Sequence, residues 1–247
     1  MGDFSYAFST NRDVGGSYAN NGNPKAATFV GTAISKWDTA SATTLYYTYT
    51  FWGANEMNAD LTGWKVGKVV TLAGTFYNAV KFIGTGLTSW DTASTTTMDS
   101  TFHGASEMNA DLTGWKVGKV VTLLNTFFGA AKFTGTGLSS WDIASATSLW
   151  STFYGASKMN ADLTGWKVGK VITLEHTFNG ASKFTGTGVD TWNVVKVTSM
   201  FSTFLNAASL ASCNKHKIAD AWTSSAVFVA TTYDTDWAAD TCAVRFE

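Results

Sequence analysis

The chain has 247 residues, of which 45% are hydrophobic and 14% are charged, and its net charge is −1. This apolar content suffices for one extended core, whereas the weak charge argues against nucleic acid or an acidic membrane surface as a partner. No strongly apolar stretch of 18 residues predicts a membrane span.

The most informative feature of the sequence is an internal repeat. Thirteen residues, MNADLTGWKVGKV, occur unchanged from Met57, Met108 and Met159, so the period is 108 − 57 = 51 residues. A fixed period predicts stacked units that bury their apolar sides against one another. Tryptophan marks a finer period of about 26 residues, at Trp37, Trp64, Trp90, Trp115, Trp141, Trp166 and Trp192.

Each coil of the repeat is predicted to contain a strand, a turn, a short helix and a second turn. Aliphatic or β-branched residues on both sides of each tryptophan favour an inward-facing strand. Leucine or methionine followed four residues later by phenylalanine is typical of a helix face, and Ser/Thr before it and Gly/Asn after it are typical of helix ends.

These patterns predict an α/β solenoid, a leucine-rich-repeat-like right-handed stack of about seven strand-turn-helix coils of 25–26 residues. In chain order, we expect an N-terminal cap at 1–28, the repeat solenoid at 29–204 and a C-terminal cap at 205–247.

Charges alternate at the position after each tryptophan. Stacked coils would turn this column into a ladder of opposite charges, which favours one register between neighbours. The column contains Asp38, Lys65, Asp91, Lys116, Asp142, Lys167 and finally Asn193.

Both cysteines of the chain, Cys213 and Cys242, lie in the predicted C-terminal cap. We predict that they form a disulfide, with two free buried thiols as the alternative. A disulfide favours an extracellular, cell-surface or secretory-lumen location, where oxidising conditions maintain such bonds.

A family resemblance follows from two segments near the end of the repeats. The chain reads FNGASKF at 178–184 and WNVVKVTSMFSTF at 192–204. This pattern resembles the BspA-like or DUF285 leucine-rich-repeat family, a 26-residue surface-protein repeat. The resemblance implies a secreted or surface-associated protein, with adhesion as a role of some members and with no catalytic residues to assign.

No residue pattern predicts catalysis, a cofactor or a metal. His103, His176 and His216 lack the spacing of a metal site with a second His or a Cys. Asp60 with nearby Asn58, and their repeated equivalents, offers few oxygen ligands for calcium, so an Asx turn is the preferred interpretation. We therefore predict a protein that is not an enzyme.

The leading functional hypothesis is a module that binds another protein or surface macromolecule. The repeated tryptophans are expected in the core, with a sugar-stacking platform as the alternative. Aromatic residues at positions that vary between coils are better candidates for a contact surface. They are Trp52, His103, Phe128, Trp150 and Tyr154. The sequence does not distinguish this role from that of a structural spacer or a subunit of a larger assembly.

An alternative hypothesis is an ice- or crystal-surface binding protein that uses Thr/Ser columns. A regular threonine array on a rigid stack would suit such a surface, although positions on a helix surface also account for these threonines. The column contains Thr50, Thr75, Thr101, Thr126, Thr152, Thr177 and Thr203.

Overall fold

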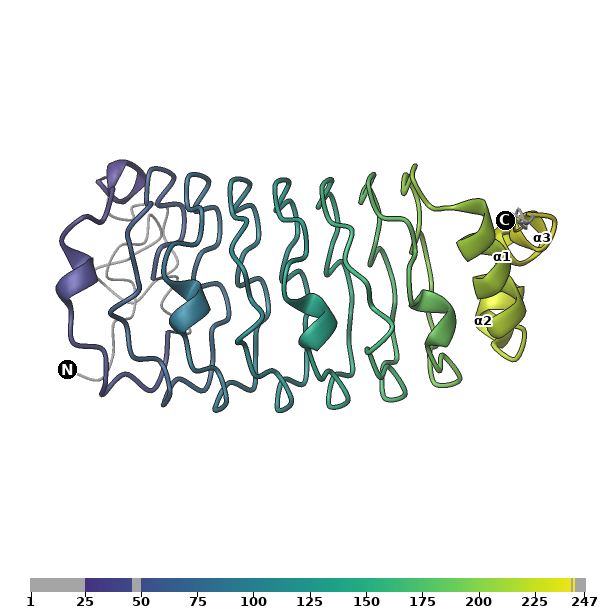
Figure 1. Cartoon of the computed structure of the whole chain (residues 1–247), viewed down its shortest axis with the longest axis horizontal. Coiled ribbons are helices and arrows are strands. Elements are labelled where there is room, and N and C mark those ends of the chain that lie inside the picture. Colours follow the sequence, from purple (N-terminus) through teal and green to yellow (C-terminus); the bar gives the residue numbers. More distant parts are fainter. Residues whose placement is uncertain (1–24, 46–49, 241, 243–247) are drawn as a thin grey trace, which may run out of the picture.

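The computed structural model describes residues 25–45, 50–240 and 242. Figure 1 shows similar coils side by side in one row, followed by a group of helices at the C-terminal end. The predicted N-terminal cap lies outside the described residues, apart from 25–28.

Regular secondary structure is sparse in the described part of the chain. The coils contain short 3-10 helices: η1 (Ala26–Thr28), η2 (Ile34–Lys36), η3 (Leu87–Ser89), η4 (Leu138–Ser140) and η5 (Val189–Thr191). The α-helices follow the coils: α1 (Ser212–Ala221), α2 (Ala226–Val229) and α3 (Thr232–Ala238). No strand forms among the described residues, where β-pairing is limited to isolated parallel bridges between neighbouring coils, such as Thr71 with Thr97.

The predicted α/β solenoid of strand-turn-helix coils is therefore wrong. The predicted helices are turns, because alternate backbone N–H groups bond to the next coil instead of along the chain. Leu72 and Phe76 donate to the carbonyls of Thr97 and Thr101 at 3.0 and 2.9 Å. An α-helix would need each N–H to bond to the carbonyl four residues earlier. The four-residue spacing instead reflects two inward-facing residues on either side of a tight turn.

The predicted strands are also turns. Trp90 directly follows η3, and its N–H donates to the carbonyl of Leu87 within the same coil at 3.1 Å. The Gly and Asn residues predicted at helix ends do adopt the left-handed conformation, with φ of 54° at Asn78 and 68° at Gly104. Their chemistry was interpreted correctly, but they close turns.

Two aromatic ladders form the core of the stack. Neighbouring phenylalanines stack from Phe51 to Phe204, with ring centroids 5.4 to 5.7 Å apart. The tryptophans form a parallel ladder, in which the Trp115 indole N–H donates to the Leu87 carbonyl at 2.9 Å. From Trp64 onward the repeated tryptophans are buried, so the prediction of a core role is confirmed and the sugar platform is excluded for them.

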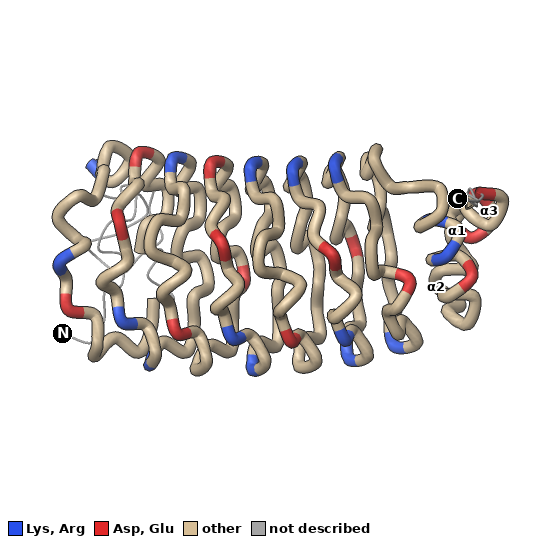
Figure 2. Tube along the Cα trace, in the orientation of Figure 1, with Lys and Arg blue, Asp and Glu red and all other residues tan. Residues whose placement is uncertain are grey.

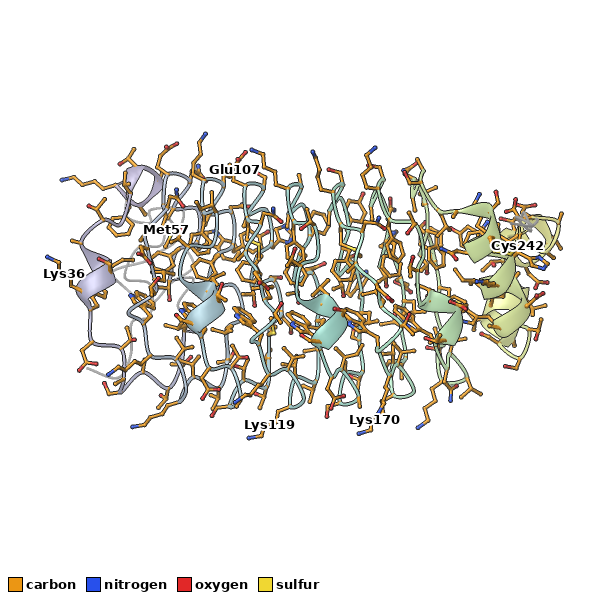
Figure 3. All side chains as sticks on the ribbon, viewed as in Figure 1. Lys36, Met57, Glu107, Lys119, Lys170 and Cys242 are labelled. Atoms are coloured by element: carbon orange, nitrogen blue, oxygen red, sulfur yellow. A yellow bond between two sulfur atoms is a disulfide. The ribbon has the colours of Figure 1, made fainter. Side chains whose placement is uncertain are left out.

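The 51-residue period has a packing cause. Coils with a Gly-Thr-Gly turn place Phe133 against Phe127 at 4.3 Å, whereas the intervening coils place Met108 in the equivalent buried position. Figure 3 shows the equivalent Met57 inside the stack. The Met coils also bond to the next coil, since the Asn109 side-chain carbonyl accepts the N–H of Thr134 at 2.9 Å.

Charge contributes little to the register. Figure 2 shows the basic residues of the coils mostly on the loops along the long edges of the stack, whereas several acidic residues lie between these edges. Within the predicted charge column, Lys116 approaches Asp91 at 3.8 Å with both side chains exposed. Exposed pairs of this kind contribute about 0 to 1 kcal/mol.

The C-terminal helices cover the last coil. The Phe204 ring, which ends the core ladder, packs against Trp222 and Trp237. The predicted disulfide between Cys213 and Cys242 is confirmed, and it fastens the end of the described chain to α1.

Removing the disulfide should loosen the C-terminal helices locally. The bond closes a sequence separation of 29 residues, for which chain entropy gives a stabilisation of about 3.6 kcal/mol. We expect the Cys213→Ser/Cys242→Ser double variant to lose hydrogen-exchange protection in α1 and α3, with the coils before Phe184 unchanged. A uniform loss of protection through all coils would contradict this local role.

Candidate contact surface

A third aromatic ladder lies on the outside of the coils. Trp52, Tyr77, His103, Phe128 and Tyr154 each follow a core residue of the phenylalanine ladder, and each is half-buried. Their successive ring centroids are 3.7, 4.2, 4.4 and 4.5 Å apart, with interplanar angles of 2° to 6°. The structure thus brings together four of the five predicted contact residues, and Tyr77 completes the row.

Stacking determines which parts of the outer-ladder rings a ligand could contact. Each inner ring has its two faces covered by neighbours, so ring edges are left for solvent or a partner. Burial lowers the pKa of His103, which favours the neutral imidazole between Tyr77 and Phe128. The ladder is therefore a rigid apolar ridge, unsuited to stacking on flat sugar faces.

The outer ladder ends at Tyr154 in a more open cluster. Asn179 occupies the next ladder position, and His176 packs its ring edge-on against Tyr154 at 6.0 Å and against Phe201 at 5.3 Å. The Asn179 amide lies 3.3 Å from Nδ1 of His176. His176 therefore links the outer ladder to the ring of Phe201, which is not one of the predicted contact residues.

Large apolar side chains are exposed around this junction. Trp150 is 45% exposed and Phe201 68%, at equivalent positions two coils apart with the half-buried Glu175 at that position between them, and Leu205 is 48% exposed at the ladder position of its own coil. We call Trp150, Tyr154, His176, Phe201 and Leu205 the aromatic surface. Single exposed apolar residues are ordinary, but a cluster of them is typical of an interaction site.

A sequence signal for the missed residues was available. Phe201 stands where other coils have Asp99, Leu124, Trp150 and Glu175, and Leu205 stands where Asn179 follows the five rings of the outer ladder. The carboxylate of Glu175 accepts a hydrogen bond from the Ser199 hydroxyl, whereas Asp99 keeps one carboxylate oxygen buried without a hydrogen-bond partner, so the fold accommodates polar residues at this position unequally. Polar and apolar residues both occur at these positions, so packing alone does not require an apolar one.

The repeated acids form Asx turns, as predicted. The carboxylate of Asp111 accepts the N–H of Thr113 at 2.9 Å and its hydroxyl at 2.6 Å, and Asp60 and Asp162 repeat the arrangement. The hydrogen bond from the threonine hydroxyl lowers the pKa of each of these carboxyls most, and the hydrogen bond from the backbone N–H lowers it further. Over the described residues, no cluster of three or more His, Cys, Asp or Glu side chains could hold a metal ion.

The threonine column proposed for ice binding is buried. The Thr101 hydroxyl donates to the carbonyls of Met98 and Leu72, at 2.7 and 3.1 Å, inside the stack. The prediction of an ice-binding face made of these residues is wrong, because the supposed helix surface is an inward-facing turn. The buried set is Thr50, Thr75, Thr101, Thr126, Thr152, Thr177 and Thr203.

Family comparison agrees with the coil pattern. The family described as Mycoplasma protein of unknown function, DUF285, matches residues 23–115, 48–149 and 124–236, which together span most of the chain. The chain belongs to the DUF285 family. No curated protein and no solved structure matches this DUF285 chain.

Across the described residues, no helix has the length and apolar character needed to cross a membrane. The disulfide is compatible with an extracellular location.

Proposed function

We propose that this DUF285 protein is a non-enzymatic, secreted or surface-associated module that binds another protein through the aromatic surface. The observation that carries the proposal is the exposure of Phe201, Trp150 and Leu205 beside the rigid end of the outer ladder. Aromatic anchors on a preorganised frame lose little conformational entropy on binding, so they are typical of the residues that dominate interface energetics.

The disulfide supports a role outside the reducing cytosol. Asp99 and Asn179 stand at the positions of Phe201 and Leu205 in other coils, so the coil folds with either residue type and packing alone does not explain the exposed apolar side chains. Adhesion is one form that such binding would take. A passive spacer or an assembly subunit, by contrast, would not use this surface to bind an external partner.

Replacing exposed apolar residues by the residues that other coils have at the same positions tests the proposal. We expect Phe201→Asp/Leu205→Asn, which copies the residues at Asp99 and Asn179, to weaken partner binding by roughly thirtyfold, equivalent to about 2 kcal/mol at a central aromatic site. The partner would be isolated from an extract of the native source's surface with the wild-type chain as bait. Its affinity for each variant would then be measured by calorimetry.

The matched control is Ile83→Thr. Ile83 is exposed, and Thr134 and Thr185 occupy its place in other coils, so this change also removes apolar surface without altering the coil. The control should bind like the wild type. A double variant at the aromatic surface that keeps full affinity, or a control that loses as much, would refute the assignment.

A further inference from the structure

A different pair of columns forms an uncharged strip along the coils. We call these residues the threonine strip. The outer column is Thr43, Val70, Thr96, Val121, Thr147, Ile172 and Thr198, and the inner column is Thr44, Thr71, Thr97, Thr122, Ser148, Thr173 and Ser199. The outer column is exposed and the inner one is half-buried.

The backbone holds the outer column in strict register. Successive N–H groups donate to the residue at the same position of the preceding coil: Val121 to Thr96 at 3.0 Å, Thr147 to Val121 at 2.9 Å, and Ile172 to Thr147 at 2.9 Å. The isolated parallel bridges join residues of the inner column. Side chains therefore repeat once per coil, at the strand spacing of about 4.8 Å.

The side chains of the outer column are also fixed. The hydroxyl of Thr147 donates to the Val121 carbonyl at 3.0 Å, and those of Thr96 and Thr198 do the same to the carbonyls of Val70 and Ile172. These bonds fix each hydroxyl while its oxygen keeps lone pairs for water. Between the threonines, the branched side chains of Val70, Val121 and Ile172 are each about half exposed.

The charge pattern narrows the choice of partner. Nucleic acids, lipid headgroups and charged polymers need countercharges, and neither column contains one. The lysines that bound the strip lie two residues before the outer column, and Figure 3 shows Lys119 and Lys170 pointing away from the stack along its edge. The strip suits an uncharged partner whose own structure repeats at the coil spacing.

We propose that the threonine strip binds the surface of an ice crystal. Water is held at the fixed hydroxyls of alternate coils and around the methyl groups of the coils between them, so it is arranged in a regular row along the strip, as water molecules are arranged in rows in ice. The ligand is therefore the water lattice itself. The strip uses columns other than those of the aromatic surface, so this inference does not depend on the proposed function.

Thermal hysteresis and ice-affinity partition of the full chain test this inference. We expect the wild type to depress the freezing point below the melting point and to concentrate in the growing ice fraction. Thr147→Lys should lose both effects, because a long charged side chain interrupts the strip at its centre. Thr96→Lys tests the same expectation in a second coil.

The controls separate the strip from general effects. Val121→Thr introduces a residue type that the outer column already contains, so it should retain thermal hysteresis and enrichment in ice. The aromatic-surface variant Phe201→Asp/Leu205→Asn should retain both as well. Circular dichroism and melting curves would confirm that each variant is folded. A folded wild type without hysteresis or enrichment in ice would overturn the inference. So would hysteresis that survives both lysine variants, or a concentration-dependent dimer that Thr147→Lys abolishes without any ice activity.

Discussion

Phe127→Ala is expected to destabilise the protein by about 4 kcal/mol, within the range for truncating a fully buried phenylalanine. Phe127 stacks between Phe102 and Phe153 at 5.6 Å on each side, and it also contacts Phe133 and Trp141. Its loss leaves a cavity in the middle of the ladder, which the hydrogen-bonded coils cannot close without breaking their register. Urea denaturation followed by tryptophan fluorescence would measure the change.

The adjacent residue supplies the matched comparison. Phe128 also stacks between two rings, His103 and Tyr154, but it belongs to the half-buried outer ladder. Phe128→Ala should therefore cost less, about 1 to 2 kcal/mol, because less apolar surface returns to water. Equal losses for the two variants would contradict the distinction between the core ladder and the outer ladder.

Gly137→Ala is expected to destabilise the stack by roughly 4 kcal/mol, from left-handed strain and overpacking at about 1 to 3 kcal/mol each. Gly137 has φ of 96°, and an added Cβ would lie 2.2 Å from the backbone nitrogen of Thr113 and 2.4 Å from the carbonyl carbon of Leu112. Both contacts are backbone atoms of the neighbouring coil, so relief requires the coils to separate.

A second glycine provides the control for this variant. A Cβ at Gly169 would meet no atom within 4 Å, and this residue does not have positive φ. Gly169→Ala should therefore stay within about 0.5 kcal/mol of the wild type, as surface substitutions usually do. Thermal melting of the two variants in parallel would compare them. A Gly137→Ala protein as stable as Gly169→Ala would contradict the close approach of neighbouring coils.

Local chemistry in this chain was predictable from sequence, whereas hydrogen bonding between coils was not. The buried tryptophan column, the left-handed Gly104 and the Asx turn at Asp111 depend on residue type and near neighbours. The helices and strands were predicted wrongly, because the partner of the Leu72 N–H is 25 residues away in the sequence, at Thr97. Periodicity reports which residues face inward but does not report where backbone groups bond.

The candidate site was predictable in part for the same reason. Variation between coils identified Trp52, His103, Phe128 and Tyr154, and stacking joined them into one ladder. The helix assumption placed Thr101 on the surface although it is buried. His176 was missed because its importance comes from an edge-on contact with Phe201 of the next coil, which no spacing within one coil reveals, whereas Phe201 itself could have been selected from the variation at its position.

Site-specific photo-cross-linking tests the proposed binding surface most directly. A photoreactive phenylalanine analogue would replace Trp150 in one protein and Ile83, away from the aromatic surface, in another, since both side chains are exposed. We predict that irradiation in an extract of the native source's surface joins one protein partner to position 150 and not to position 83. Equal cross-linking at both positions, or a partner that links only at position 83, would contradict it.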